Sequence, residues 1–460
     1  MQRRVFLTLL LALAASVSVL GQSVASRNAR AAPASLERSV IYQLWMRSFT
    51  PEHTLKAVTA RLPYIAELGA DIIYMSPLNV HGYQPSDRGP NIRSRPYEIK
   101  DYDRIEPEYG TEEDLKALVA EAHKLGLKVM MDIVYGHSAN DCVLLNRPGF
   151  FQRTPDGALL ISRWKTPMPN FTNPQVREYF RDNMVHWVRD VGIDGFRADW
   201  PGVVPIEFWE QARDAMDKVN REVIMLSEAD RPEHQLKAFD ISYNGLHFSA
   251  LQAAFLNGES AERIRQQWEK AKAAYPRGSR FLHWNDNHDQ NRVDVAFGAR
   301  AAMTTSVLNF TMDGIPFIYN GQEIGDTSPT SVSIRWPTAQ PGSGQRSRQN
   351  ARLEIYKRLM EMRKQEPAFT SGELVWVKNS NPDGVVSFVR RRGGDEILIL
   401  INTVNRPTTV EVDLPAAGYA GARDLVKNQP VRSSAAGARL SIPLGALDYV
   451  VAKRASPRAM

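Results

Sequence analysis

Three carboxylate side chains in this sequence each follow a short apolar run. Such a run is typical of a buried strand, and catalytic residues are expected where these strands end. Asp199 lies two residues after Arg197 in GIDGFRADW, Glu228 ends IMLSE, and Asp289 lies in NDNHDQNR. A carboxylate nucleophile and a carboxylic acid on either side of an acetal carbon can break a glycosidic bond. Asp199 and Glu228 are the candidates for these two roles.

Apolar strand-like segments alternate with amphipathic helical segments as far as residue 366, which is typical of βα units and a parallel sheet. A helix is predicted around residues 54–68, and Thr111 with Asp114 forms the capping box of the next one. In a (β/α)8 barrel all strands point their carboxyl ends at one face, so motifs on separate strands can converge there. Eight strand segments fit this arrangement: SVIYQLWM, DIIYMSPL, LKVMMDIVY, DGFRAD, VIMLSE, FDISYN, FLHWN and PFIYN.

The chain resembles the α-amylase family of glycoside hydrolases, because MDIVYGH, GIDGFRADW, IMLSEAD and NDNHDQNR are similar to the four signature regions of that family. The resemblance covers nearly the whole chain and implies a retaining TIM-barrel glycosidase. It implies that Asp199 is the nucleophile, that Glu228 is the general acid/base, and that Asp289 is a third carboxylate holding sugar hydroxyls. These three are the expected catalytic residues.

The resemblance also implies a set of residues that bind substrate or support the site. Arg197 is expected to orient the nucleophile, and Asp132 corresponds to the structural aspartate of the third strand. Trp200 either stacks on a sugar or packs beneath its loop, and packing is favoured. The full set comprises Arg197, His137, His288, Tyr83, Asp132 and Trp200.

Four segments are expected along the chain. Residues 1–31 have a basic start and an apolar stretch and are predicted to be a signal peptide. Residues 36–366 form the barrel, and residues 138–172 form a short domain B inserted after the third strand. From 367 to 455 the pattern changes to alternating apolar and polar positions, which predicts an antiparallel β-sandwich domain.

The signal segment predicts export to the periplasm or the medium of a bacterial cell. Arg3 and Arg4 fit either a twin-arginine signal or an ordinary secretory signal. Small-residue cleavage sites occur at Ser23–Ala25 and at Ala29–Ala31, and the sequence does not choose between them. No stable membrane association is expected once this segment is removed.

Composition sets further limits on function. The formal charge is +6 over 460 residues, and no basic run is interleaved with aromatic residues, so no nucleic-acid partner is expected. Cys142 is the only cysteine, which excludes an intrachain disulfide, and its loop setting does not suggest a catalytic thiol. The sequence leaves the oligomeric state unknown.

Departures from the family pattern affect the cofactor prediction. Gly136 stands where the family usually has an asparagine that contributes to a calcium site, and Gly202 and Val203 stand where many α-amylases have Lys-His. Because calcium takes six to eight oxygen ligands, we expect no metal at that site and no cofactor, while the sequence leaves open calcium elsewhere in the protein.

The expected substrate is an α-1,4-glucan such as starch, maltodextrin or a maltooligosaccharide, cleaved by double displacement. A short domain B is expected to leave the cleft open. The alternatives are a transglycosylase or isomerase using the same residues, which differs in whether water or a sugar accepts the glucosyl group, and a catalytically silent carbohydrate-binding relative.

Overall fold

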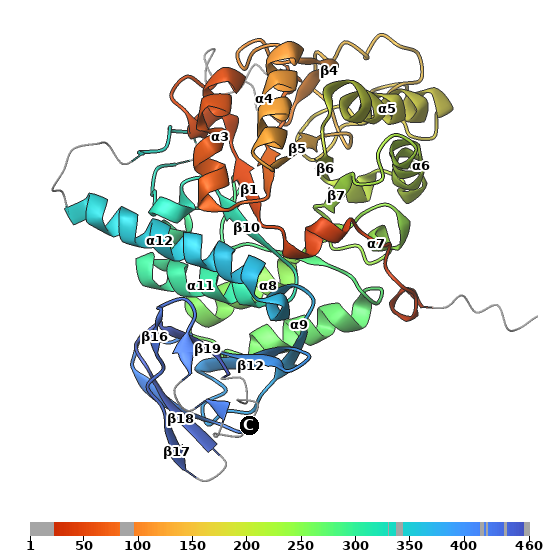
Figure 1. Ribbon diagram of the computed structural model, residues 1–460. Coiled ribbons are helices and arrows are strands. Elements are labelled where there is room, and N and C mark those ends of the chain that lie inside the picture. Colours follow the sequence, from red (N-terminus) through yellow and green to blue (C-terminus); the bar gives the residue numbers. More distant parts are fainter. Residues whose placement is uncertain are drawn as a thin grey trace, which may run out of the picture.

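Eight parallel strands close into a barrel in this computed structural model, as the sequence predicts (Figure 1). The structure describes residues 23–82, 96–329, 331–336, 344–414, 418–419, 422–436 and 439–454, so the predicted signal segment lies outside the described residues as far as residue 22. The barrel strands are β1 (Ile41–Leu44), β2 (Ile72–Met75), β5 (Lys128–Ile133), β6 (Gly195–Ala198), β7 (Ile224–Ser227), β8 (Ile241–Tyr243), β9 (Phe281–His283) and β10 (Ile315–Tyr319). They pair in this order, and β10 pairs with β1.

Alternating side chains of these strands fill two different cores. Ile41, Ile72 and Leu226 point into the barrel with Tyr74 and Phe317, whereas their neighbours point outward against the helices. Both sets are almost completely buried. A strand buried on both faces reads as a continuous apolar run, which explains why the strands could be found from the sequence.

The helices surround the barrel (Figure 1). Thr54 caps the first long one, and Thr111 with Asp114 forms the predicted capping box of the next, which confirms both predicted starts. The α-helices are α2 (Met46–Phe49), α3 (Leu55–Leu68), α4 (Glu112–Lys124), α5 (Pro174–His186), α6 (Ile206–Asp217), α7 (His234–Lys237), α8 (Gly245–Phe255), α9 (Glu262–Ala274), α10 (Val293–Phe297), α11 (Ala299–Thr311), α12 (Gly344–Gln365) and α13 (Pro367–Thr370). The shorter turns are η1 (Val24–Ser26), η2 (Ala34–Arg38), η3 (Trp187–Val191), η4 (Pro201–Val203) and η5 (Gln322–Ile324).

Two segments on the carboxyl side of the barrel strands depart from the βα repeat. One holds the antiparallel pair β3 (Asn79–His81) and β4 (Ile99–Ile105) between β2 and α4. The other, which we call the insertion (residues 138–172), joins β5 to α5 and carries isolated bridges such as Phe151–Pro169 and Ile161–Pro167. The insertion is therefore a short segment of irregular structure, in the place predicted for domain B.

The C-terminal region forms the predicted antiparallel sandwich. Its larger sheet has the order β11-β12-β13-β19-β15-β16 and its smaller sheet the order β14-β18-β17. Leu398 and Leu400 face the smaller sheet, while Ile397, Ile399 and Ile401 of the same strand join the barrel core, so the larger sheet is buried on both faces. The strands are β11 (Glu373–Trp376), β12 (Val385–Arg392), β13 (Asp395–Asn402), β14 (Thr408–Val412), β15 (Arg423–Asp424), β16 (Gln429–Pro430), β17 (Ser434–Ala436), β18 (Arg439–Leu444) and β19 (Tyr449–Lys453).

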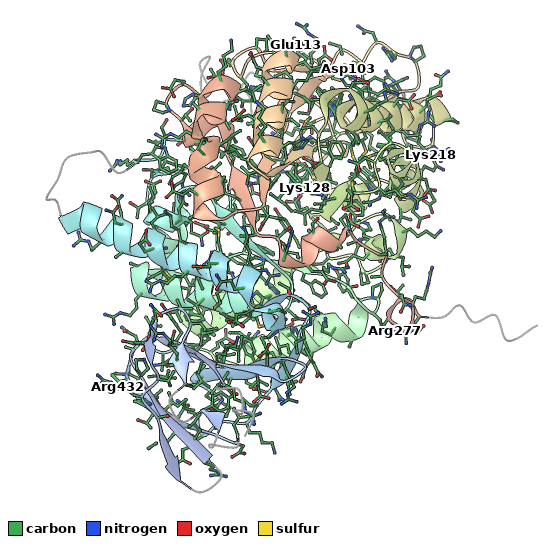
Figure 2. All side chains as sticks on the ribbon, viewed as in Figure 1. Asp103, Glu113, Lys128, Lys218, Arg277 and Arg432 are labelled. Carbon is green, nitrogen blue, oxygen red and sulfur yellow. The ribbon has the colours of Figure 1, made fainter. Side chains whose placement is uncertain are left out.

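Charged side chains at the periphery of the molecule include Glu113 on α4, Lys218 just after α6 and Arg432 between β16 and β17 (Figure 2). Within the described residues, no helix combines the length and the apolar character needed to cross a membrane. Cys142 is buried, and burial raises the pKa of its thiol to about 11. Its thiol therefore stays protonated and unreactive at neutral pH.

Candidate active site

The catalytic candidates gather at the carboxyl end of the barrel because each follows or ends a strand. Asp199 comes directly after β6 and Glu228 directly after β7, while His288 and Asp289 lie in the loop between β9 and α10. Parallel register places Asp132 of β5 opposite Arg197 of β6. The motifs that the sequence singled out thus converge on one face, as expected for this fold.

Arg197 is fully buried and connects three carboxylates. Its Nη1 donates to Asp132 Oδ1 at 3.0 Å and to Asp199 Oδ1 at 2.8 Å. Its Nη2 pairs with Glu228 Oε1. One guanidinium group therefore touches both the proposed nucleophile and the proposed acid, and fixes their relative position.

The two central carboxyl groups have opposite pKa shifts. Burial raises the pKa of Glu228 to about 8, with a further rise from Asp199 that the charge of Arg197 opposes. Burial alone would also raise the pKa of Asp199, but contact with His137 and Arg197 holds it below its usual value. At neutral pH the site therefore combines a protonated Glu228 with an ionised Asp199, which is the pairing that acid-assisted displacement requires.

His288 is held by a hydrogen-bonded aromatic group. Its Nδ1 lies 2.8 Å from Gln43 Nε2, and its Nε2 lies 2.7 Å from Tyr97 Oη. Tyr97 also donates to Asp132 Oδ2 at 2.6 Å. The rings of His288 and Tyr97 both lie nearly parallel to Trp45, with centroids 4.9 Å and 6.2 Å from it. Burial lowers the pKa of His288 to about 4, so the ring is neutral above pH 5.

A cavity of about 670 Å³ opens over these groups. His137 and Asp199 line it, and His137 Nε2 lies 3.7 Å from Asp199 Oδ2. Asp289 reaches it with a side chain that is 58% exposed, and its Oδ2 lies 3.3 Å from His288 Nε2. A carboxylate this exposed is available to accept hydrogen bonds from sugar hydroxyls.

Trp200 lines the cavity and also packs against the insertion, so its expected packing is present while stacking on a sugar stays a prediction. Its ring lies edge-on to Trp164 with centroids 4.5 Å apart, and its backbone N–H donates to Glu228 Oε2 at 2.8 Å. Tyr83 lies outside the described residues, so its predicted stacking role stays a prediction.

Sequence reasoning missed Tyr97, Trp45 and Trp164. Tyr97 lies in RPYEI, just before β4, where no strand-end pattern marks it. Trp164 lies in the insertion, which has no periodic signal. Trp45 directly follows the first strand, so its position could have identified it as a candidate site residue from the sequence.

The residues at the expected calcium site do not fit a cation. A Cβ built at Gly136 would stand 2.9 Å from Val203 Cγ2 and 3.4 Å from a ring carbon of Trp200. The position that would carry an amide ligand is therefore closed by the Val203 and Trp200 side chains, with the Trp200 carbonyl oxygen 3.5 Å away. Across the described residues, no group of three or more His, Cys, Asp or Glu side chains is arranged to hold a metal.

Comparison with known proteins agrees with this geometry. A family model described as "Alpha amylase, catalytic domain" matches residues 34–148 and 159–340. Alpha-amylase MalA of Haloarcula japonica is 27% identical over 436 residues, covering 87% of this chain and 62% of that protein. Neopullulanase 2 of Thermoactinomyces vulgaris is 26% identical over 436 residues, covering 86% of this chain and 72% of that protein.

Solved structures show the same relationship. The crystal structure of a noncanonic maltogenic α-amylase, AmyB from Thermotoga neapolitana, superposes with a TM-score of 0.80 at 26% identity. The match covers 91% of this chain and 99% of that one. The overall arrangement of this chain is thus found in a solved α-amylase structure of similar extent.

Proposed function

Because this chain belongs to the α-amylase family of glycoside hydrolases, we propose that it hydrolyses α-1,4-glucosidic bonds in starch, maltodextrin or related α-glucans with retention of configuration. The observation that carries the proposal is the contact of one buried guanidinium, Arg197, with both Asp199 and Glu228. Such an arrangement suits two carboxyl groups about 5 Å apart, the separation of retaining glycosidases.

In the first step Glu228 protonates the glycosidic oxygen while Asp199 attacks the anomeric carbon. The C–O bond to the leaving sugar breaks, and a covalent β-glucosyl ester forms on Asp199. Arg197 keeps Asp199 ionised up to the moment of attack. The raised pKa of Glu228 supplies the proton at neutral pH.

In the second step Glu228, now ionised, removes a proton from water, and the water oxygen displaces Asp199 from the anomeric carbon. His137 and His288 flank the reacting sugar, and Asp289 accepts bonds from its hydroxyls. A neutral His288 adds no positive charge beside a developing oxocarbenium ion.

The assay that tests this proposal follows the first-formed anomer by proton NMR during cleavage of maltotetraose. Retention predicts the α-anomer first, with the β-anomer appearing later by mutarotation. Asp199→Asn should reduce the rate by about 10³-fold or more, while full activity in that variant would refute the assignment of the nucleophile.

Product analysis separates hydrolysis from its alternatives. Starch, pullulan, maltooligosaccharides and sucrose are incubated with the enzyme, and the products are resolved by chromatography. Accumulation of longer or rearranged glucosides in place of reducing sugars would indicate a transglycosylase or isomerase. Binding without turnover on every substrate would indicate a silent relative.

A further inference from the structure

An aromatic pair links the insertion to the barrel beside the position where the family resemblance places calcium. Trp164 belongs to the insertion and Trp200 to the loop after β6, and their rings meet edge to face at 4.5 Å. The guanidinium of Arg163 lies 4.3 Å from the Trp164 ring and 5.2 Å from the Trp200 ring. This trio, which we call the aromatic clamp (Arg163, Trp164 and Trp200), joins two segments that are distant in sequence.

The aromatic clamp adjoins the side chains that fill the space at Gly136. The six-membered part of the Trp200 ring and the Val203 side chain both stand within about 3.5 Å of the position a Cβ would take at Gly136. On its other side Trp164 packs against His137, with centroids 4.8 Å apart. Contacts between side chains thus connect the insertion, the β5 end and the β6 loop along one wall of the active-site cavity, which Arg163, Trp164 and Trp200 all line.

The clamp also reaches the general acid through the backbone of Trp200. Trp200 has φ +42° and ψ +47°, a left-handed conformation that is costly for a bulky residue and persists only when its surroundings impose it. In this conformation its N–H donates to Glu228 Oε2 at 2.8 Å. The ring contacts that hold Trp200 in place therefore also hold the donor that orients Glu228.

We propose that the aromatic clamp replaces the family's structural calcium, fastening the insertion to the barrel and positioning the general acid through the Trp200 amide. Trp164 is then a positioning residue, because it acts on Glu228 through Trp200. The catalytic part of this inference rests on the proposed function, whereas the structural part does not.

The structural part is tested on the purified enzyme by elemental analysis and thermal unfolding. We expect no stoichiometric calcium, and the same Tm with and without EDTA. Trp164→Ala should lower Tm and expose the insertion to limited proteolysis. Bound calcium, together with a fall in Tm on chelation, would overturn the replacement.

The catalytic part is tested by comparing leaving groups. General-acid assistance matters most for a poor leaving group and little for an acidic phenol. Trp164→Ala should therefore lower kcat on maltotetraose by up to about 10²-fold, lower it far less on 2,4-dinitrophenyl α-maltoside, and be rescued by Trp164→Phe.

The matched control is Trp376→Ala, which removes a half-buried indole from another edge-to-face pair, with Trp268 at 5.8 Å, on the first strand of the C-terminal sandwich. This variant should lower Tm, and any change in its kcat should be the same for both leaving groups. Equal losses on both substrates in Trp164→Ala would overturn the positioning role. If the wild-type enzyme cleaves no α-glucoside at all, the proposed function fails, while the calcium and Tm measurements still decide the clamp.

Discussion

At the scale of single residues, the site depends on one arginine that distributes its charge among three carboxylates. Arg197 touches Asp132, Asp199 and Glu228, yet only Glu228 is expected to exchange a proton during turnover. Burial raises the pKa of Asp132 to about 6 against the opposing charge of Arg197, so Asp132 is ionised at neutral pH and balances the guanidinium. Glu228 differs from Asp132 and Asp199 in protonation state because its environment differs, and not because of its residue type.

The pKa of Glu228 predicts the basic limb of the pH profile. Glu228 must be protonated to act as an acid, so activity is present below its pKa of about 8 and is lost as the pH rises through that value. We expect kcat/KM on maltotetraose to decline above about pH 8. Glu228→Gln should lower kcat by about 10²–10⁴-fold and remove this limb; an unchanged basic limb in that variant would assign it to another group.

Tyr97 is expected to matter more for turnover than its position outside the signature motifs suggests. Tyr97→Phe removes bonds to Asp132 and His288 but leaves the ring over Trp45. Loss of bonds of this kind should lower kcat/KM by about tenfold.

The matched control for Tyr97 is Tyr74→Phe. Tyr74 also donates to Asp132 Oδ2 at 2.6 Å, but it is buried inside the barrel and does not line the cavity. If Tyr74→Phe lowers kcat/KM as much as Tyr97→Phe, the effect passes through Asp132 alone and not through contact with His288.

At the scale of elements, the described end of the predicted signal segment packs against the barrel. Arg30 Nη1 and Nη2 each lie 3.1 Å from Asp217 carboxylate oxygens, and its Nε lies 3.2 Å from Asp240, which is buried. We therefore expect signal removal after Ala25 rather than after Ala31, since the later site would discard Arg30. Mass spectrometry of the N-terminus of the processed protein checks this, and a mature start at Ala32 would contradict it.

The same contact has a stability consequence. Arg30→Ala leaves Asp240 with Arg213 as its remaining cation and should lower the free energy of unfolding by about 1–3 kcal/mol. Arg27→Ala is the control, because the Arg27 side chain is exposed. Urea unfolding of the two variants side by side makes the comparison.

At the scale of the whole molecule, two buried arginines bind backbone carbonyls where the C-terminal region meets the barrel, and Arg390 is the one on a C-terminal sheet. Arg390 on β12 donates to the backbone carbonyls of Thr311, Phe369 and Gly372. Arg363 on α12 donates to Glu37, Gly314 and Phe369. Burial lowers the pKa of both side chains, to about 9 for Arg363 and about 10 for Arg390, and both remain charged at neutral pH.

Removing one of these arginines should uncouple the two regions. Arg390→Met leaves the carbonyls of Thr311 and Gly372 without this donor and leaves that of Phe369 with Arg363 alone, which should cost about 2–5 kcal/mol. We expect calorimetry to show a C-terminal transition that precedes barrel unfolding, whereas Arg392→Met, at an exposed position on the same strand, keeps the wild-type profile. A single unshifted transition in Arg390→Met would show that apolar packing alone couples the regions.

Local sequence was sufficient for the elements and for the central residues of the site. The barrel strands are continuous apolar runs because both faces are buried, and Asp199 and Glu228 follow such runs directly. The helix starts at Thr54 and Thr111 were readable because a cap is a contact between residues three apart. These features depend on neighbours in the chain.

The tertiary structure decided everything that depends on contacts between distant segments. Tyr97 enters the site by lying against Trp45 and His288, and Trp164 meets Trp200 across an irregular insertion, so neither has a periodic signal. The sequence showed that the asparagine at position 136 was missing, whereas only packing showed that Val203 and Trp200 close that space. Local sequence patterns were thus enough to predict the barrel and its reaction class. How Glu228 is held and which side chains fill the space at Gly136 depend on residues that only folding brings together.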